Sequence, residues 1–201
     1  MPLEIGLDRR ATFTVADRKA QYDAAMRVSG LFERMSGLVA KLGAIKAQTE
    51  AKIAKLPAGD PERVKAEALL ARAEAIRGKV VATKEGGAIT GEERLREHLD
   101  TAWGGVTFTE ERPTPYHLER VNVLERELKE VEDEFAQLVA TQVAELNTAF
   151  AVRKIAAIDV SVVEAPDVEA KGGPAAALAT GLVGLRYYGS YEALGARGAR
   201  D

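Results

Sequence analysis

The stretch that decides the fold runs from Thr114 to Lys154 and reads TPYHLERVNVLERELKEVEDEFAQLVATQVAELNTAFAVRK. Apolar residues recur along it in steps of three and four, the spacing that keeps one side of an α-helix buried. This stripe comprises Leu118, Val121, Leu124, Leu128, Val131, Phe135, Leu138, Gln142, Leu146 and Ala149. Thr114 is a suitable N-cap and Pro115 a suitable first helical residue. We therefore predict one helix over 114–154, about 60 Å long at 1.5 Å per residue.

A second long helix is predicted over 14–56. Thr14 and Asp17 have the spacing of a capping box at its start. Its apolar stripe has nearly a heptad period and comprises Tyr22, Ala25, Val28, Leu31, Phe32, Met35, Leu38, Val39, Leu42, Ile45, Thr49 and Ile53. Gly30, Gly37 and Gly43 each weaken the helix by about 1 kcal/mol relative to alanine. We expect packing to hold this helix, and the glycines to permit close helix approach.

Two shorter helices are predicted between the long ones. Asp60 and Pro61 restart a helix that runs to about Thr83, and its apolar positions are Val64, Ala68, Ala71 and Ala75 beside Leu69, Ala73, Ile76 and Val80. Thr90 and Glu93 cap a short helix that holds Leu95, Leu99 and Trp103, and turn glycines are expected at Gly86-Gly87 and Gly104-Gly105. Because the breaks are short, neighbouring helices should be antiparallel. The predicted fold class is an all-α antiparallel bundle with two long and two shorter helices.

The two ends of the chain differ in character from this bundle. Leu3–Leu7 alternates apolar and polar residues, which predicts a short strand. We expect residues 1–13 to be a lead-in from an upstream domain, 14–156 to be the bundle, and 157–201 to be a loosely ordered Ala/Gly-rich tail. Within that tail, Ala157–Glu164 has the apolar content of a strand.

Composition bounds the class of protein. The chain has 201 residues, 46% of them apolar and 29% charged, as in ordinary soluble globular proteins. A net charge of −3 gives no argument for attraction to nucleic acid or membrane. The absence of cysteine excludes disulfides and thiolate metal sites. Met1–Arg10 lacks the apolar core of a signal peptide, and Ala175–Leu185 is too short to span a bilayer.

The sequence predicts no catalytic, cofactor or metal site. Its two histidines, His98 and His117, lack the spacing of di-iron bundles or zinc proteases. The carboxylates of 125–134 are interleaved with Arg126 and Lys129, as on a solvated helix face. The glycine pairs lack the Lys-Ser/Thr of a phosphate loop.

Three residues are candidates for an interaction role: Trp103, Tyr116 and Gln142. Trp103 is a packing plug or a stacking platform. Gln142 either fixes register within the helix seam or faces the bundle edge. The tail sequence Gly195–Arg200, with Tyr187 and Tyr188 nearby, faintly resembles an arginine–glycine nucleic-acid segment, but no wider basic patch accompanies it.

The order of these pieces resembles a known family. The resemblance is carried by Leu7-Asp8-Arg9, Val15-Ala16-Asp17, Gln21-Tyr22-Asp23, Arg94-Leu95 with Leu99, Arg112-Pro113-Thr114 and Leu146-Asn147. Together they look like the helical C-terminal region of bacterial BNR/Asp-box repeat proteins of the sortilin type, often labelled glycosyl hydrolases or sialidase-like. The resemblance covers roughly residues 3–158. It departs from the family at Asp8-Arg9-Arg10, where an Asp-Pro-Arg turn is usual.

The resemblance implies a detached, non-catalytic module rather than a hydrolase, because the family's β-propeller and its catalytic residues are not in this sequence. The implied partners are the family's own propeller or β-sandwich domains, or a second copy of the chain. Members of the family are typically exported. The alternative is a stand-alone coiled-coil scaffold or oligomerisation protein.

Overall fold

The structure is a computed structural model, and it describes residues 10, 12–82 and 93–161. The elements, in chain order, are α1 (Val15–Ile53), α2 (Pro61–Val80), α3 (Leu95–Thr107), α4 (Pro115–Leu138), the π-helical turn η2 (Val139–Val143) and α5 (Ala144–Val152). The predicted all-α class is confirmed, since no strand occurs within these described ranges. The strand predicted over 3–7 lies outside them.

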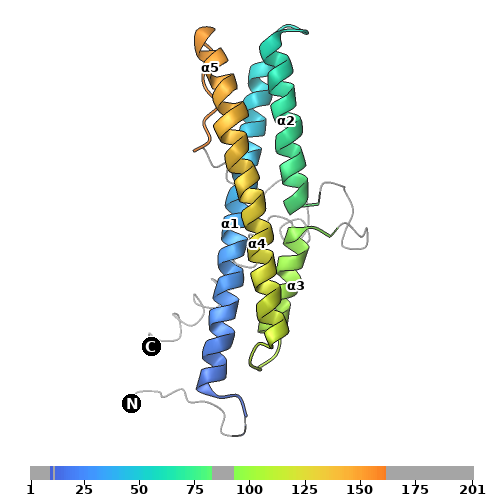
Figure 1. Ribbon diagram of the computed structural model, residues 1–201, viewed down its shortest axis with the longest axis vertical. Helices are drawn as coiled ribbons and strands as arrows, with labels where there is room; N and C mark the ends of the chain where they lie inside the picture. The colour runs from blue at the N-terminus through green and yellow to red at the C-terminus, as the bar shows by residue number, and fades with distance from the viewer. Residues whose placement is uncertain (1–9, 11, 83–92, 162–201) are drawn as a thin grey trace, which may run out of the picture.

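The helices form an elongated bundle, and a cross-section at most levels cuts three helices. α1 and the continuous rod of α4, η2 and α5 run the length of the molecule (Figure 1). α2 packs beside the upper half of both, and α3 beside the lower half. α2 and α3 run in the opposite direction to α1 and to the α4–α5 rod. The two short helices therefore share one position in the cross-section.

Side-chain caps set where three of the helices begin. The Thr14 hydroxyl accepts a hydrogen bond from the Asp17 amide at 3.2 Å, and the Asp17 carboxylate accepts one from the Thr14 amide at 3.1 Å, which confirms the capping box. Asp60 and Thr114 cap α2 and α4 in the same way, each followed by proline. Such caps satisfy amides that have no partner within the helix.

α3 differs from its prediction at both ends. It begins at Leu95 rather than next to Thr90, which lies outside the described residues, and the Glu97 carboxylate accepts a hydrogen bond from the Arg94 amide at 2.9 Å. Gly104 and Gly105, predicted as turn residues, lie inside the helix, which continues to Thr107.

The core is a single apolar seam between the helices. On α1 it comprises Ala24, Val28, Leu31, Met35, Leu38, Leu42, Ile45 and Thr49, so the predicted stripe is confirmed from Val28 onward. Tyr22, predicted in that stripe, is 64% exposed. On α2 the set Leu69, Ala73, Ile76 and Val80 is buried, whereas Val64, Ala68, Ala71 and Ala75 are exposed.

The prediction of one regular α-helix over 114–154 is wrong around Gln142, where the rod contains the π-helical turn η2. The π-helical turn inserts one extra residue, so the buried stripe passes from Leu138 to Val143 and then to Leu146 and Phe150. Gln142 is exposed as a result, and Phe150 is buried where Ala149 was predicted. Burying a phenylalanine side chain stabilises a fold by roughly 1.5–3 kcal/mol, which offsets the poorer geometry of the π turn.

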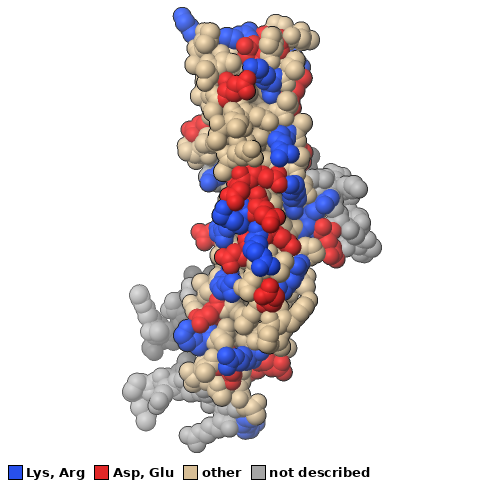
Figure 2. Space-filling view, viewed as in Figure 1, with Lys and Arg blue, Asp and Glu red and all other residues tan. Residues whose placement is uncertain are grey.

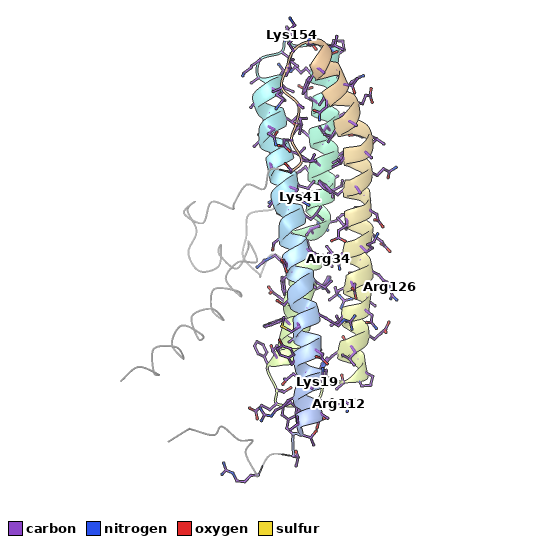
Figure 3. The ribbon with its side chains drawn as sticks, turned by 90° about the vertical axis from the view of Figure 1, so that its left-hand side faces the viewer. Lys19, Arg34, Lys41, Arg112, Arg126 and Lys154 are labelled. Atoms are coloured by element: carbon purple, nitrogen blue, oxygen red, sulfur yellow. The ribbon has the colours of Figure 1, made fainter. Side chains whose placement is uncertain are left out.

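After α5 the chain turns back along the bundle, between α1 and α5 (Figure 3). Lys154 makes this reversal with φ of 56°, and the Ile155 amide donates to the Phe150 carbonyl at 2.9 Å, a Schellman motif. We call Ile155–Ser161 the strap. Ile158 is only 3% exposed.

Two side-chain amides clamp the strap. Asn147 Oδ1 accepts from the Ile158 amide at 2.7 Å, and Asn147 Nδ2 donates to the Ile158 carbonyl at 3.0 Å. Gln48 makes the same pair of bonds with Asp159, each 2.8 Å long. The strand predicted over 157–164 is therefore wrong for its described part, because these carboxamides occupy the backbone groups that a strand would pair. The domain boundary expected at 156 falls inside the strap.

Candidate interaction surface

Three large apolar residues are exposed on the side of α1 that is turned away from the core. Val15, Tyr22 and Met26 are 70%, 64% and 51% exposed. Their spacing of seven and four places them on one stripe of the helix. That stripe lies opposite the buried one that contains Val28 and Met35. A surface helix normally carries charged or polar residues there.

Few charged residues occur on this side of α1 between Tyr22 and the C-terminal end of the helix. The helical period places nine residues on it: Tyr22, Met26, Gly30, Glu33, Gly37, Ala40, Ala44, Ala47 and Ala51. Glu33 is the one charged member of this set, and Lys19, one turn before Tyr22, lies on the same side of the helix. We call Val15 to Gly37 on this side the open face, because Ala44 is already buried at 2% exposure. The strap reaches α1 one turn beyond Ala44, at Gln48.

The glycines of the open face are not required by the packing of the bundle. A Cβ added at Gly30 or at Gly37 would meet no atom within 4 Å. Each glycine nevertheless weakens the helix by about 1 kcal/mol relative to alanine. The shallow positions above these two residues are therefore open, and the exposed side chains of Tyr22 and Met26 stand beside them.

The side of the bundle formed by α1 and α4 is different, because its charges are used to join helices. Arg34 binds Glu132 through two hydrogen bonds of 2.6 and 3.0 Å. Arg27 binds Asn122 at 2.8 Å and Glu125 at 3.0 Å. Figure 2 shows charged side chains of both signs gathered over the middle of the molecule. The shallow groove at Arg34 and Glu125 is therefore part of an ion-pair network rather than an open site.

Further ion pairs join α2 to the α4–α5 rod. Glu134 accepts from Lys79 and, at 3.4 Å, from Arg72. Lys65 binds Glu145 at 2.6 Å. Exposed pairs of this kind each contribute little to stability. Their effect is to fix which side of each helix faces its neighbour. Among the described helices, none packs on the open face of α1.

A tighter charged cluster closes the upper end of the bundle. Arg153 Nη1 lies 2.7 and 2.8 Å from the two carboxylate oxygens of Asp60 and 2.7 Å from Glu62 Oε2. The hydrogen bond from Arg153 holds the pKa of Asp60 well below its ordinary value. Asp60 is also the N-cap of α2. This cluster therefore joins the start of α2 to the end of α5, and its groups are already paired.

The three interaction residues predicted from sequence do not form one site. Trp103 is half-buried and packs against the core from α3. Tyr116, 73% exposed, lies edge-on to His117 with ring centroids 5.8 Å apart. Gln142 is exposed on η2, about 40 Å further along the rod than Tyr116. Sequence reasoning missed the open face, although the residues that form it, Tyr22 and Gly30 among them, were singled out for other reasons.

The histidines lie apart from one another. His98, on α3, lies 4.0 Å from Glu93, which precedes that helix. His117, on α4, packs against Gly105, where an added Cβ would be 3.4 Å from the imidazole ring. Within the described part of the chain, no group of three or more histidine, aspartate or glutamate residues is placed to hold a metal ion. None of the described helices is both long and apolar enough to cross a membrane. The arginine–glycine motif over 195–200 lies outside the described residues.

In its described part, the chain is an all-α bundle in which α1 presents the open face. No family model, curated protein or solved structure matches this chain. The resemblance to the helical region of BNR-repeat proteins therefore stays a prediction.

Proposed function

We propose that this chain is a non-catalytic helical interaction module that binds a protein partner through the open face of α1. The observation that carries the proposal is the exposure of Val15, Tyr22 and Met26 on one stripe. Single exposed apolar residues are common on protein surfaces, but contiguous ones mark binding sites. On the open face, Tyr22 and Met26 are adjacent and lead to two glycines, and Val15 continues the stripe beyond Lys19.

The rest of the bundle supports an interaction role by being rigid. Two helices run its whole length, ion pairs cross between them, and the strap is clamped at two successive residues. A rigid helix face loses little conformational entropy when it docks. The glycines let a partner helix approach closely, as small residues do at helix interfaces.

The two hypotheses from the sequence predict different partners. If the chain is a BNR-type module, the partner is a propeller or β-sandwich domain. If it is a stand-alone scaffold, the partner is another helical chain, and the spacing of residues on the open face favours this second possibility. A flat sheet surface offers no reason for large residues at 22 and 26 followed by glycines at 30 and 37, whereas helix packing does.

Photo-crosslinking in the source cells tests the proposal. A photoreactive phenylalanine analogue replaces Tyr22 in one variant and Arg126 in the other. Arg126 points away from the bundle on α4 (Figure 3), and its side chain is 68% exposed, so it is a matched surface control. We expect position 22 to yield a discrete crosslinked protein and position 126 to yield none. Equal crosslinking at both positions, or none at position 22, would overturn the proposal.

A further inference from the structure

The spacing of residues on the open face is the same in both directions from Met26. The positions are Val15, Lys19, Tyr22, Met26, Gly30, Glu33 and Gly37. They are separated by steps of four, three and four residues on either side of Met26. Steps of three and four keep all seven on one side of the helix. Such a symmetric pattern suits an antiparallel pair of identical helices, because a two-fold axis brings residue i of one copy to residue j of the other and j to i.

An antiparallel pair of α1 helices that cross at Met26 brings complementary residues together. Residues equally far from Met26, on opposite sides of it, then face each other. Val15 lies opposite Gly37 of the second copy, and Tyr22 lies opposite Gly30. Each large exposed side chain is therefore matched with a position where the bundle leaves open space. Knobs that enter holes in this way are the basis of close helix packing.

The charges on the open face match in the same register. Lys19 lies opposite Glu33 of the second copy, and the symmetry makes this pair occur twice. Lys19 is well exposed, at 73% of its side chain, and its present partner is Asp23 in its own helix. A parallel pair in register would instead place Glu33 on Glu33 and glycine on glycine. Like charges opposite each other are unfavourable, and facing glycines leave the holes unfilled.

From these observations, and resting on the proposed function, we infer that the partner is a second copy of this chain. The two α1 helices pack antiparallel through the open face, with the two-fold axis at Met26. The contact extends over Val15 to Gly37, about 33 Å at 1.5 Å per residue. It ends where Ala44 is already buried. An interface of this length is small, so the dimer forms in a concentration-dependent way.

Cysteine crosslinking tests the axis directly, because the chain has no cysteine of its own. Met26→Cys places two thiols next to each other across the axis. Ala47→Cys places a thiol on the same side of α1 but beyond the contact, and it is the control. A short bis-maleimide is added to each purified full-length variant. We expect Met26→Cys to give a band at twice 21.6 kDa and Ala47→Cys to stay at 21.6 kDa. Equal yields from both variants, or no dimer from Met26→Cys, would overturn the inference.

A charge exchange tests the register. Lys19→Glu and Glu33→Lys each place like charges opposite each other and should weaken the dimer several-fold in sedimentation experiments. The double variant restores both pairs and should restore the dimer. Failure of the double variant to recover would contradict the register. If the chain stays a monomer while position 22 crosslinks to a different protein, the second copy is the wrong partner and the proposed function stands. If position 22 crosslinks to nothing, both fail.

Discussion

Replacing Asn147 with alanine should release the strap. The side-chain amide of Asn147 makes two hydrogen bonds with the backbone of Ile158, at 2.7 and 3.0 Å. Alanine removes both and leaves the Ile158 amide and carbonyl without these partners. A hydrogen bond contributes about 0.5–1.5 kcal/mol net, so the loss should be about 1–3 kcal/mol. Gln48→Ala is the matched control, since its bonds to Asp159 lie in an exposed setting where water can replace them.

Hydrogen exchange at the Ile158 amide measures this directly. If the strap opens locally, a loss of 1–3 kcal/mol accelerates exchange by about 5- to 150-fold. Asn147→Ala should show this acceleration, and Gln48→Ala should show a smaller one. The amides of α1 around Met35, far from the strap, should exchange as in the wild type in both variants. Unchanged exchange at Ile158 in Asn147→Ala, or a larger effect from Gln48→Ala, would refute the account of the clamp.

Three further predictions concern the rod and its ends. Lys154→Gly should raise the free energy of unfolding by up to about 1 kcal/mol in urea titrations, because glycine adopts the positive φ of this position without strain. The pKa of Asp60 is lowered by Arg153, so its contribution is fully present above the unfolded pKa, at about pH 4, and is lost as the pH falls below it. Unfolding curves from neutral pH to about pH 2 should therefore show the Arg153→Ala variant less stable than wild type at neutral pH and converging with it in acid. Deleting Gln142 should convert η2 to regular α-helix and keep the fold, with the midpoint of thermal unfolding near that of wild type. Deleting Lys129 should instead shift half of the buried stripe out of register and lower that midpoint by many degrees.

Much of the fold follows from local rules that the sequence displays. Thr14, Asp60 and Thr114 begin helices because a short polar side chain can satisfy the free amides of a first turn. The stripe from Val28 to Thr49 was predicted because apolar spacing and helical geometry agree over many turns. These signals involve neighbours in sequence, and local physics decides them.

The misses depend on contacts between distant segments. Nothing near Gln142 distinguishes a π turn from an α-helix; Phe150 decides it, because burying that ring favours a shift of one residue. The strap escaped prediction because its partners are side chains on two helices, Gln48 being 111 residues away from Asp159 in sequence. Both features appear only after the helices have been placed in space.

The open face was missed for a different reason. α1 carries two apolar stripes on opposite sides. The steps of three from Val28 through Ala25 lead the predicted stripe to Tyr22, whereas the heptad of Leu31, Leu38 and Ile45 leads back to Ala24, which is the residue that is buried. A sequence alone does not say which of two stripes faces the core. Once Val28 and Met35 are known to be buried, the second stripe is evident. Its role as a contact surface would explain why glycine occupies positions 30 and 37.

The central claim is that the open face of α1 binds a second copy, and sedimentation equilibrium tests it most directly. Three proteins are compared over a range of concentrations: wild type, Gly30→Leu and Gly43→Leu. A Cβ added at either glycine would meet no atom within 4 Å, and leucine favours a helix more than glycine does, so we expect both variants to fold. Gly30→Leu fills the hole that receives Tyr22, whereas Gly43 lies outside the contact. We predict that wild type and Gly43→Leu dimerise with rising concentration and Gly30→Leu stays a monomer. A wild-type chain that is monomeric throughout, or the same association in all three proteins, would contradict the claim.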